Sequence, residues 1–129
     1  MFIYIFFGIL IISAILALYL SIVFGKKSKL SQDKLNYYKN KIALLEKEDW
    51  YKQIIQYDSI LSNILKDLWY KWWLWEQLKK KPRIISWKLN EIWELHKLRN
   101  KIAHELWNTN NEFLRKSATR YKTILLSIL

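Results

Sequence analysis

The chain has 129 residues, of which 22 are Lys or Arg and 11 are Asp or Glu, giving a formal net charge of +11 at pH 7. It contains no cysteine, which excludes a disulfide framework and a thiolate metal site. A surplus of positive charge draws a protein toward polyanions. These are nucleic acid or an anionic membrane surface, and charge alone does not choose between them.

Residues 1–25 form an apolar run without a charged side chain. About 20 such residues let a helix cross the hydrocarbon core, so we expect a transmembrane anchor here. A cleaved signal peptide fits less well, because the run has no basic start, is too long and ends without a small-residue cleavage site. Lys26, Lys27 and Lys29 follow the run. This predicts a single-pass protein of the inner (cytoplasmic) membrane with its C-terminal domain in the cytoplasm.

Residues 26–48 predict a juxtamembrane helical stalk, because apolar side chains recur there at steps of three and four. These are Leu35, Tyr38, Ile42 and Leu45. The stretch is too short to hold a coiled coil alone, but it would help two copies to lie side by side.

Residues 49–129 predict one helical domain. Asp49 is a candidate N-cap for a helix that ends near Leu68, and a short helix over residues 76–80 is stopped by Pro82. A further helix covers residues 88–106, and a polar turn over 108–111 precedes the last helix. Its expected inward residues are Phe113, Ala118, Tyr121, Ile124, Leu125 and Ile128. The predicted fold class is all-α: an N-terminal transmembrane helix, a helical stalk and a four-helix bundle.

Four polar side chains fall on one arc of the helix over residues 88–106, beside its apolar arc. They are His96, Arg99, Asn100 and His104. Together they suit cleavage of a phosphodiester without a metal, since imidazole moves protons near neutral pH and guanidinium holds phosphate. A metal site fits less well, because the two histidines lie eight residues apart. The competing interpretation is structural, with Arg99 and Asn100 paired inside the fold and His104 at the helix end.

The segment LNEIWELHKLRNKIAHE, residues 89–105, resembles the signature helix of HEPN domains (higher eukaryotes and prokaryotes nucleotide-binding). Their motif is Arg, a polar residue that is often Asn, and a His with four residues between it and the Arg, which Arg99, Asn100 and His104 match. The resemblance implies an all-helical domain over residues 49–129. Many HEPN domains are metal-independent endoribonucleases that act as dimers, with the two motifs meeting in one composite cleft.

The same segment is similar to small uncharacterised proteins of reduced-genome bacteria that also begin with a membrane helix. The shared run is reproduced here by Trp93, His96, Lys97, Arg99, Asn100, Ile102, Ala103, His104 and Glu105. No Tyr stands two residues after His104, so the toxin subtype with a modified tyrosine is not supported. Some HEPN domains only bind partners or nucleotides, so the resemblance leaves activity open.

Tryptophan is unusually abundant, with eight Trp against two Gly. Four of them lie in DLWYKWWLWEQL, where a turn between helices should offer Gly, Asn or Pro. In the similar proteins this segment resembles a Leu-Gly-Tyr-x-Gly turn. One hypothesis is that UGA codons for glycine have been translated as tryptophan, with Trp69, Trp72, Trp73, Trp75, Trp87 and Trp107 as the candidates. The alternatives are an aromatic cluster at a dimer or bilayer interface and a platform that stacks RNA bases.

The sequence therefore predicts a membrane-anchored HEPN-like domain that acts as a homodimeric endoribonuclease without cofactor or metal. His104 is expected to transfer protons and Arg99 to hold the phosphate, and Asn100 is expected to orient these two side chains. Lys97 and Lys101 are expected to bind the RNA backbone, and His96 is expected to be a half-buried structural residue. The alternatives are a non-catalytic interaction or scaffold module at the membrane, and a sensor of anionic lipid.

Overall fold

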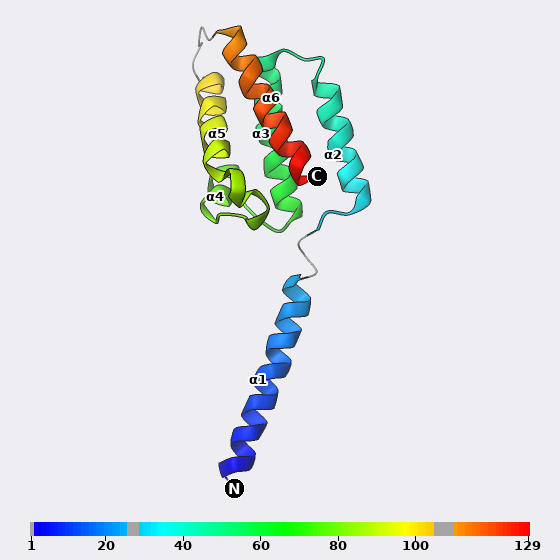
Figure 1. The fold of residues 1–129 in the computed structure, drawn as a ribbon, viewed down its shortest axis with the longest axis vertical. Coiled ribbons are helices and arrows are strands. Elements are labelled where there is room, and N and C mark those ends of the chain that lie inside the picture. Colours follow the sequence, from blue (N-terminus) through cyan, green and yellow to red (C-terminus); the bar gives the residue numbers. More distant parts are fainter. Residues whose placement is uncertain (1, 26–28, 105–109) are drawn as a thin grey trace.

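The fold is all-helical throughout the part of the chain that the computed structural model describes, residues 2–25, 29–104 and 110–129. The elements are α1 (Phe2–Gly25), α2 (Gln32–Leu45), α3 (Trp50–Asp67), α4 (Leu74–Lys79), the 3₁₀ helix η1 (Arg83–Lys88), α5 (Leu89–His104) and α6 (Asn111–Ile128). The predicted all-α class is confirmed. Figure 1 shows α1 extending away from a bundle that contains the other helices.

The transmembrane part of the predicted fold class is wrong. Among the described residues, no helix combines the length and the apolar character needed to cross a membrane. The apolar run does form the helix α1.

The predicted stalk is also corrected, because α2 packs against α3 as part of the bundle. Ser31 caps α2, since its side chain accepts a hydrogen bond from the backbone N–H of Lys34. Tyr38 and Ile42, two residues of the predicted seam, are buried in the same core as the other helices. The apolar spacing therefore marks an intramolecular contact of α2.

The core is built around α3, which contacts α2, α4, α5 and α6. Its apolar residues recur at helical spacing and are fully buried; they are Ile54, Tyr57, Ile60, Leu61, Ile64 and Leu65. From α5 and α6 the core takes Ile92, Leu95, Ile102, Ala118, Tyr121, Ile124 and Leu125. The inward positions expected in α6 are confirmed for Ala118, Tyr121, Ile124 and Leu125, whereas Phe113 is exposed near the helix start.

The segment between α3 and α4 turns sharply. The backbone φ is 74° at Trp69 and 88° at Trp72, in the left-handed region that L side chains avoid.

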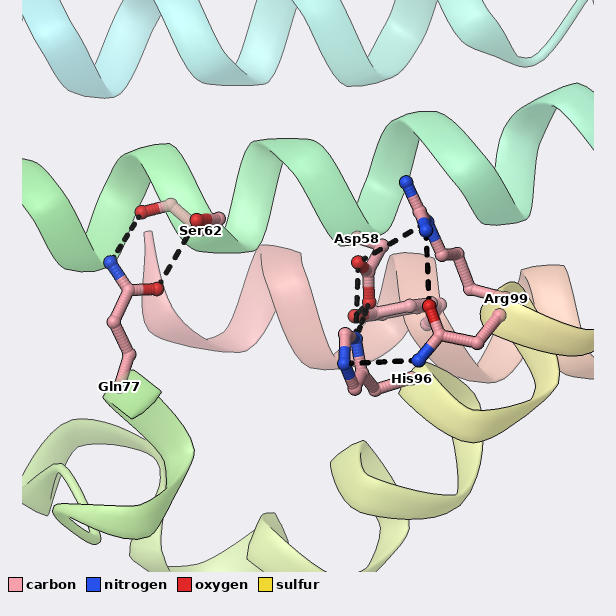
Figure 2. Close-up of polar contacts among 7 residues, drawn as sticks. Asp58, Ser62, Gln77, His96 and Arg99 are labelled. Carbon is pink, nitrogen blue, oxygen red and sulfur yellow. Dashed lines mark hydrogen bonds and ion pairs between the residues drawn. The ribbon is translucent and has the colours of Figure 1, made fainter. Parts of the chain in front are cut away.

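Beyond this turn, Gln77 of α4 holds α4 against α3 by hydrogen bonds. Its Nε2 donates to the Ser62 carbonyl oxygen and its Oε1 accepts from the Ser62 hydroxyl, both at 3.2 Å (Figure 2). Its Nε2 also donates to the Tyr70 carbonyl oxygen at 2.7 Å.

Candidate functional site

Three of the polar residues of α5 face a single carboxylate on α3. His96, Arg99 and Asn100 are spaced at i, i+3 and i+4, so one side of α5 presents all three. Opposite them lies Asp58, which follows the buried Tyr57 in the middle of α3. Figure 2 shows the His96 and Arg99 side chains directed toward Asp58. The site is therefore formed where two helices of the core pack together.

His96 is held by hydrogen bonding to Asp58. Its Nδ1 lies 2.9 Å from one carboxylate oxygen of Asp58 and 3.2 Å from the other, and both residues are buried. A carboxylate only accepts hydrogen bonds, so Nδ1 carries the hydrogen and donates it. In the neutral ring, Nε2 is then the unprotonated nitrogen, the one able to accept a proton.

A second donor to Asp58 comes from α6. The Tyr121 hydroxyl donates to the Oδ1 atom of Asp58 at 2.7 Å. Complete burial, together with the adjacent Asp58 carboxylate, raises the pKa of Tyr121 well above its usual value of 10.0. The phenol thus stays neutral and keeps donating, which fixes the carboxylate that in turn fixes His96.

Arg99 and Asn100 continue the network on the other side of the His96 ring. Asn100 Nδ2 lies 3.4 Å from His96 Nε2, and Arg99 Nη1 donates to Asn100 Oδ1 at 3.0 Å. The Arg99 Nε atom is buried and lies 3.7 Å from Asp58 Oδ2, too far for a hydrogen bond. The guanidinium is thus attracted to the carboxylate but is not locked onto it.

The network opens on a cleft of about 330 Å³ between α3, the start of α4 and α5. His96, Arg99 and Asn100 line it from α5, and Trp73, Leu74 and Trp75 line it from the α4 side. The α3 wall consists of Asp58, Ser59, Ser62, Asn63 and Lys66. A guanidinium, an amide and an oriented imidazole therefore share one cleft.

The structure separates the predicted catalytic residues into two places. Arg99 and Asn100 lie together in the cleft, but His104 is exposed at the last residue of α5 and does not line it. Lys97 and Lys101 are exposed on α5, also outside the cleft lining. Glu105 of the quoted segment lies outside the described residues.

Two members of the network, Asp58 and Tyr121, were not among the predicted site residues. Asp58 interrupts the apolar stripe of α3, between Ile54 and Leu61 on its buried side. A charged residue at a core position needs a buried partner, and this was the signal that could have identified it. His96 was expected to be a structural residue, and its partner was not predictable because the pairing of α3 with α5 is a tertiary contact.

Across the described residues, no three His, Asp or Glu side chains come together as a metal-binding group. A scan against protein-family models, a search of the curated proteins and a search of the solved structures each found no match to this chain. The likeness to HEPN domains stays a prediction that rests on the residues of α5.

Proposed function

We propose that this chain is a HEPN-like, metal-independent endoribonuclease that cleaves RNA in the cleft beside Asp58. The observation that supports this best is the orientation of His96. Its Nδ1 donates to the buried Asp58, which leaves Nε2 as the proton-accepting atom in a cleft that also contains Arg99. A base oriented by a carboxylate is an arrangement that suits proton-transfer catalysis.

The chemistry assigned to these residues is transesterification within RNA. His96 Nε2 removes the proton from a 2′-hydroxyl, whose oxygen attacks the adjacent phosphorus, and Asp58 stabilises the resulting imidazolium. Arg99 binds the non-bridging phosphate oxygens, where negative charge increases in the transition state, and Asn100 positions them. The bond to the 5′-oxygen breaks, which leaves a 2′,3′-cyclic phosphate and, after protonation, a 5′-hydroxyl.

The leaving 5′-oxygen needs a proton donor, and we assign this role to His104 of a second copy. His104 is exposed at the end of α5, outside the cleft of its own copy. The resemblance to HEPN domains implies a homodimer in which the two motifs share a composite cleft. We assign binding of the RNA backbone to Lys97 and Lys101, which are exposed on the same helix.

The first experiment is incubation of the full chain with single-stranded RNA in EDTA, beside the variants Arg99→Ala and His104→Ala. We expect products with 2′,3′-cyclic phosphate ends, with each variant about 10²- to 10⁴-fold slower while it remains folded. An equimolar mixture of the two variants should recover about a quarter of the wild-type activity. Half of the dimers are then mixed, and one of the two clefts in each mixed dimer has both Arg99 and His104. A folded protein that leaves RNA intact would refute the proposal.

The second candidate is a non-catalytic interaction or scaffold module. One observation favours it, namely that Asp58 receives donors from both His96 and Tyr121 and thereby joins α3, α5 and α6 in the core. Such a network also stabilises a fold that does no chemistry. In that case, His104→Ala and the wild type would bind the same partner equally well, and neither would cleave RNA.

A further inference from the structure

The α3 wall of the cleft carries a polar stripe that the proposed chemistry does not use. Ser59, Asn63 and Lys66 are spaced at i, i+4 and i+7, so they follow one line along the helix, and all three line the cleft. Ser62, beside this line, already binds Gln77. The stripe begins next to Asp58 and ends near the C-terminus of α3.

Lys66 is the charged end of this stripe. It is exposed, and no ion pair joins it to another residue of the described chain, whereas its neighbour Asp67 is paired with Lys34. From Ser59 to Lys66 the helix rises by about 10 Å, at 1.5 Å per residue. The two ends of the stripe are therefore about two helical turns apart, and both line the same cleft.

We infer that the cleft binds a segment of single-stranded RNA with two consecutive phosphates, one at Arg99 and the next at Asn63 and Lys66. This inference rests on the proposed function, because Arg99 marks the phosphate that is cleaved. A lysine suits the second position, since an ammonium group holds a phosphate as a point charge and does not require a fixed geometry. Ser59, between the two, would donate to the ribose or phosphate that connects them.

Binding of short non-cleavable ligands tests the inference separately from catalysis. The ligands are a 2′-deoxy dinucleoside monophosphate and the same compound with an added 5′- or 3′-phosphate, titrated into the full chain at fixed salt. We expect one of the two added phosphates to tighten binding by about threefold to tenfold. This gain should vanish in Lys66→Ala and remain in Lys39→Ala, a control at an exposed lysine of α2.

The salt dependence of binding provides a second readout. With a longer deoxyoligonucleotide, the slope of log affinity against log salt should fall by about 0.7 in Lys66→Ala, the value for one lost phosphate contact on a single strand. An equal gain from the added phosphate in wild type and Lys66→Ala, or no gain from either phosphate, would overturn the inference. Tight binding with this gain but without RNA cleavage would refute only the proposed function.

Discussion

Trp69 and Trp72 occupy backbone conformations that suit glycine, with φ of 74° and 88°. A bulky residue at positive φ costs on the order of 1–2 kcal/mol, a strain that glycine does not have. We therefore expect Trp69→Gly and Trp72→Gly each to raise the free energy of unfolding by about 1 kcal/mol. Trp73→Gly is the matched control, because φ there is −71° and no strain is relieved. Urea unfolding of the three variants measures the difference.

The same two positions bear on the hypothesis that UGA codons for glycine have been translated as tryptophan. The turn Leu68-Trp69-Tyr70-Lys71-Trp72 has its positive φ values at the two positions that glycine occupies in the expected Leu-Gly-Tyr-x-Gly turn. UGA codons at Trp69 and Trp72 in the gene would support the hypothesis, and UGG codons would reject it. If neither Trp69→Gly nor Trp72→Gly is more stable than Trp73→Gly, the strain argument is wrong as well.

Tyr121 should contribute more to stability than the neighbouring buried tyrosine. Its hydroxyl donates to the charged Asp58 at 2.7 Å, whereas the Tyr57 hydroxyl donates to the neutral amide of Gln53 at 3.3 Å. Hydrogen bonds to charged groups contribute about 1.5–3 kcal/mol, and neutral ones about 1 kcal/mol. We expect Tyr121→Phe to lower the free energy of unfolding by more than Tyr57→Phe does, as measured by urea denaturation. Equal losses would show that Tyr121 does not hold the carboxylate.

At the scale of elements, the helices followed from the sequence more closely than their contacts did. Apolar spacing and the Asp49 cap position predicted a helix ending near Leu68, and α3 is Trp50–Asp67. The 3₁₀ helix η1 was not predicted, because a short helix after Pro82 has no apolar periodicity to reveal it. The docking of α2 on α3 was not predictable either, because a seam at helical spacing fits a second copy as well as the chain's own core.

The contact between α2 and α3 should depend on pH through Asp67. Its carboxylate accepts from Tyr38 at 2.6 Å and pairs with Lys34, both on α2. Partial burial alone would raise the pKa of Asp67, but the hydrogen bonds from Lys34 and Tyr38 outweigh this effect and lower it. A lowered folded pKa gives stability that is complete above the unfolded value of about 3.9 and is lost as the pH falls below it.

The test compares Asp67→Asn with the wild type. We expect the variant to be less stable by about 1 kcal/mol at pH 7, with the difference shrinking as the pH falls below about 4. Asp49→Asn serves as the control, since the Asp49 side chain makes no capping hydrogen bond. Urea midpoints between pH 3 and pH 7 give both quantities. A stability difference that does not change with pH would contradict the role of the Asp67 carboxylate.

At the scale of the whole molecule, the core is sensitive to alkali because it buries tyrosine hydroxyls on three helices. Burial, with a smaller contribution from Glu46, raises the pKa of Tyr57 to about 12, and burial also raises the pKa values of Tyr38 and Tyr121. The unfolded chain ionises these phenols near pH 10, so stability is complete below that pH and decreases as the pH rises above it. We expect the unfolding temperature to fall between pH 10 and pH 12, as followed by circular dichroism. A constant unfolding temperature over that range would be inconsistent with buried phenols.

The candidate site was only partly predictable for the same reason that the helix contacts were. Helical spacing placed His96, Arg99 and Asn100 on one face of α5, and the structure brings them together in the cleft. Helical spacing did not reveal Asp58 or Tyr121, because their approach to His96 and to each other depends on how α3 and α6 pack. Buried hydrogen-bond networks of this kind combine residues far apart in sequence, and a local pattern identifies at most one side of each contact.

The measurement that tests the central claim most directly is the single-turnover rate of RNA cleavage in EDTA by the wild type, His96→Asn and Asp58→Asn. We expect His96→Asn to be about 10²- to 10⁴-fold slower, because it removes the atom that accepts the proton. Asp58→Asn should be slower too, because the His96 imidazole loses the carboxylate that orients it and stabilises the imidazolium. A His96→Asn protein that remains folded and cleaves RNA at the wild-type rate would contradict the assignment of this cleft as the catalytic site.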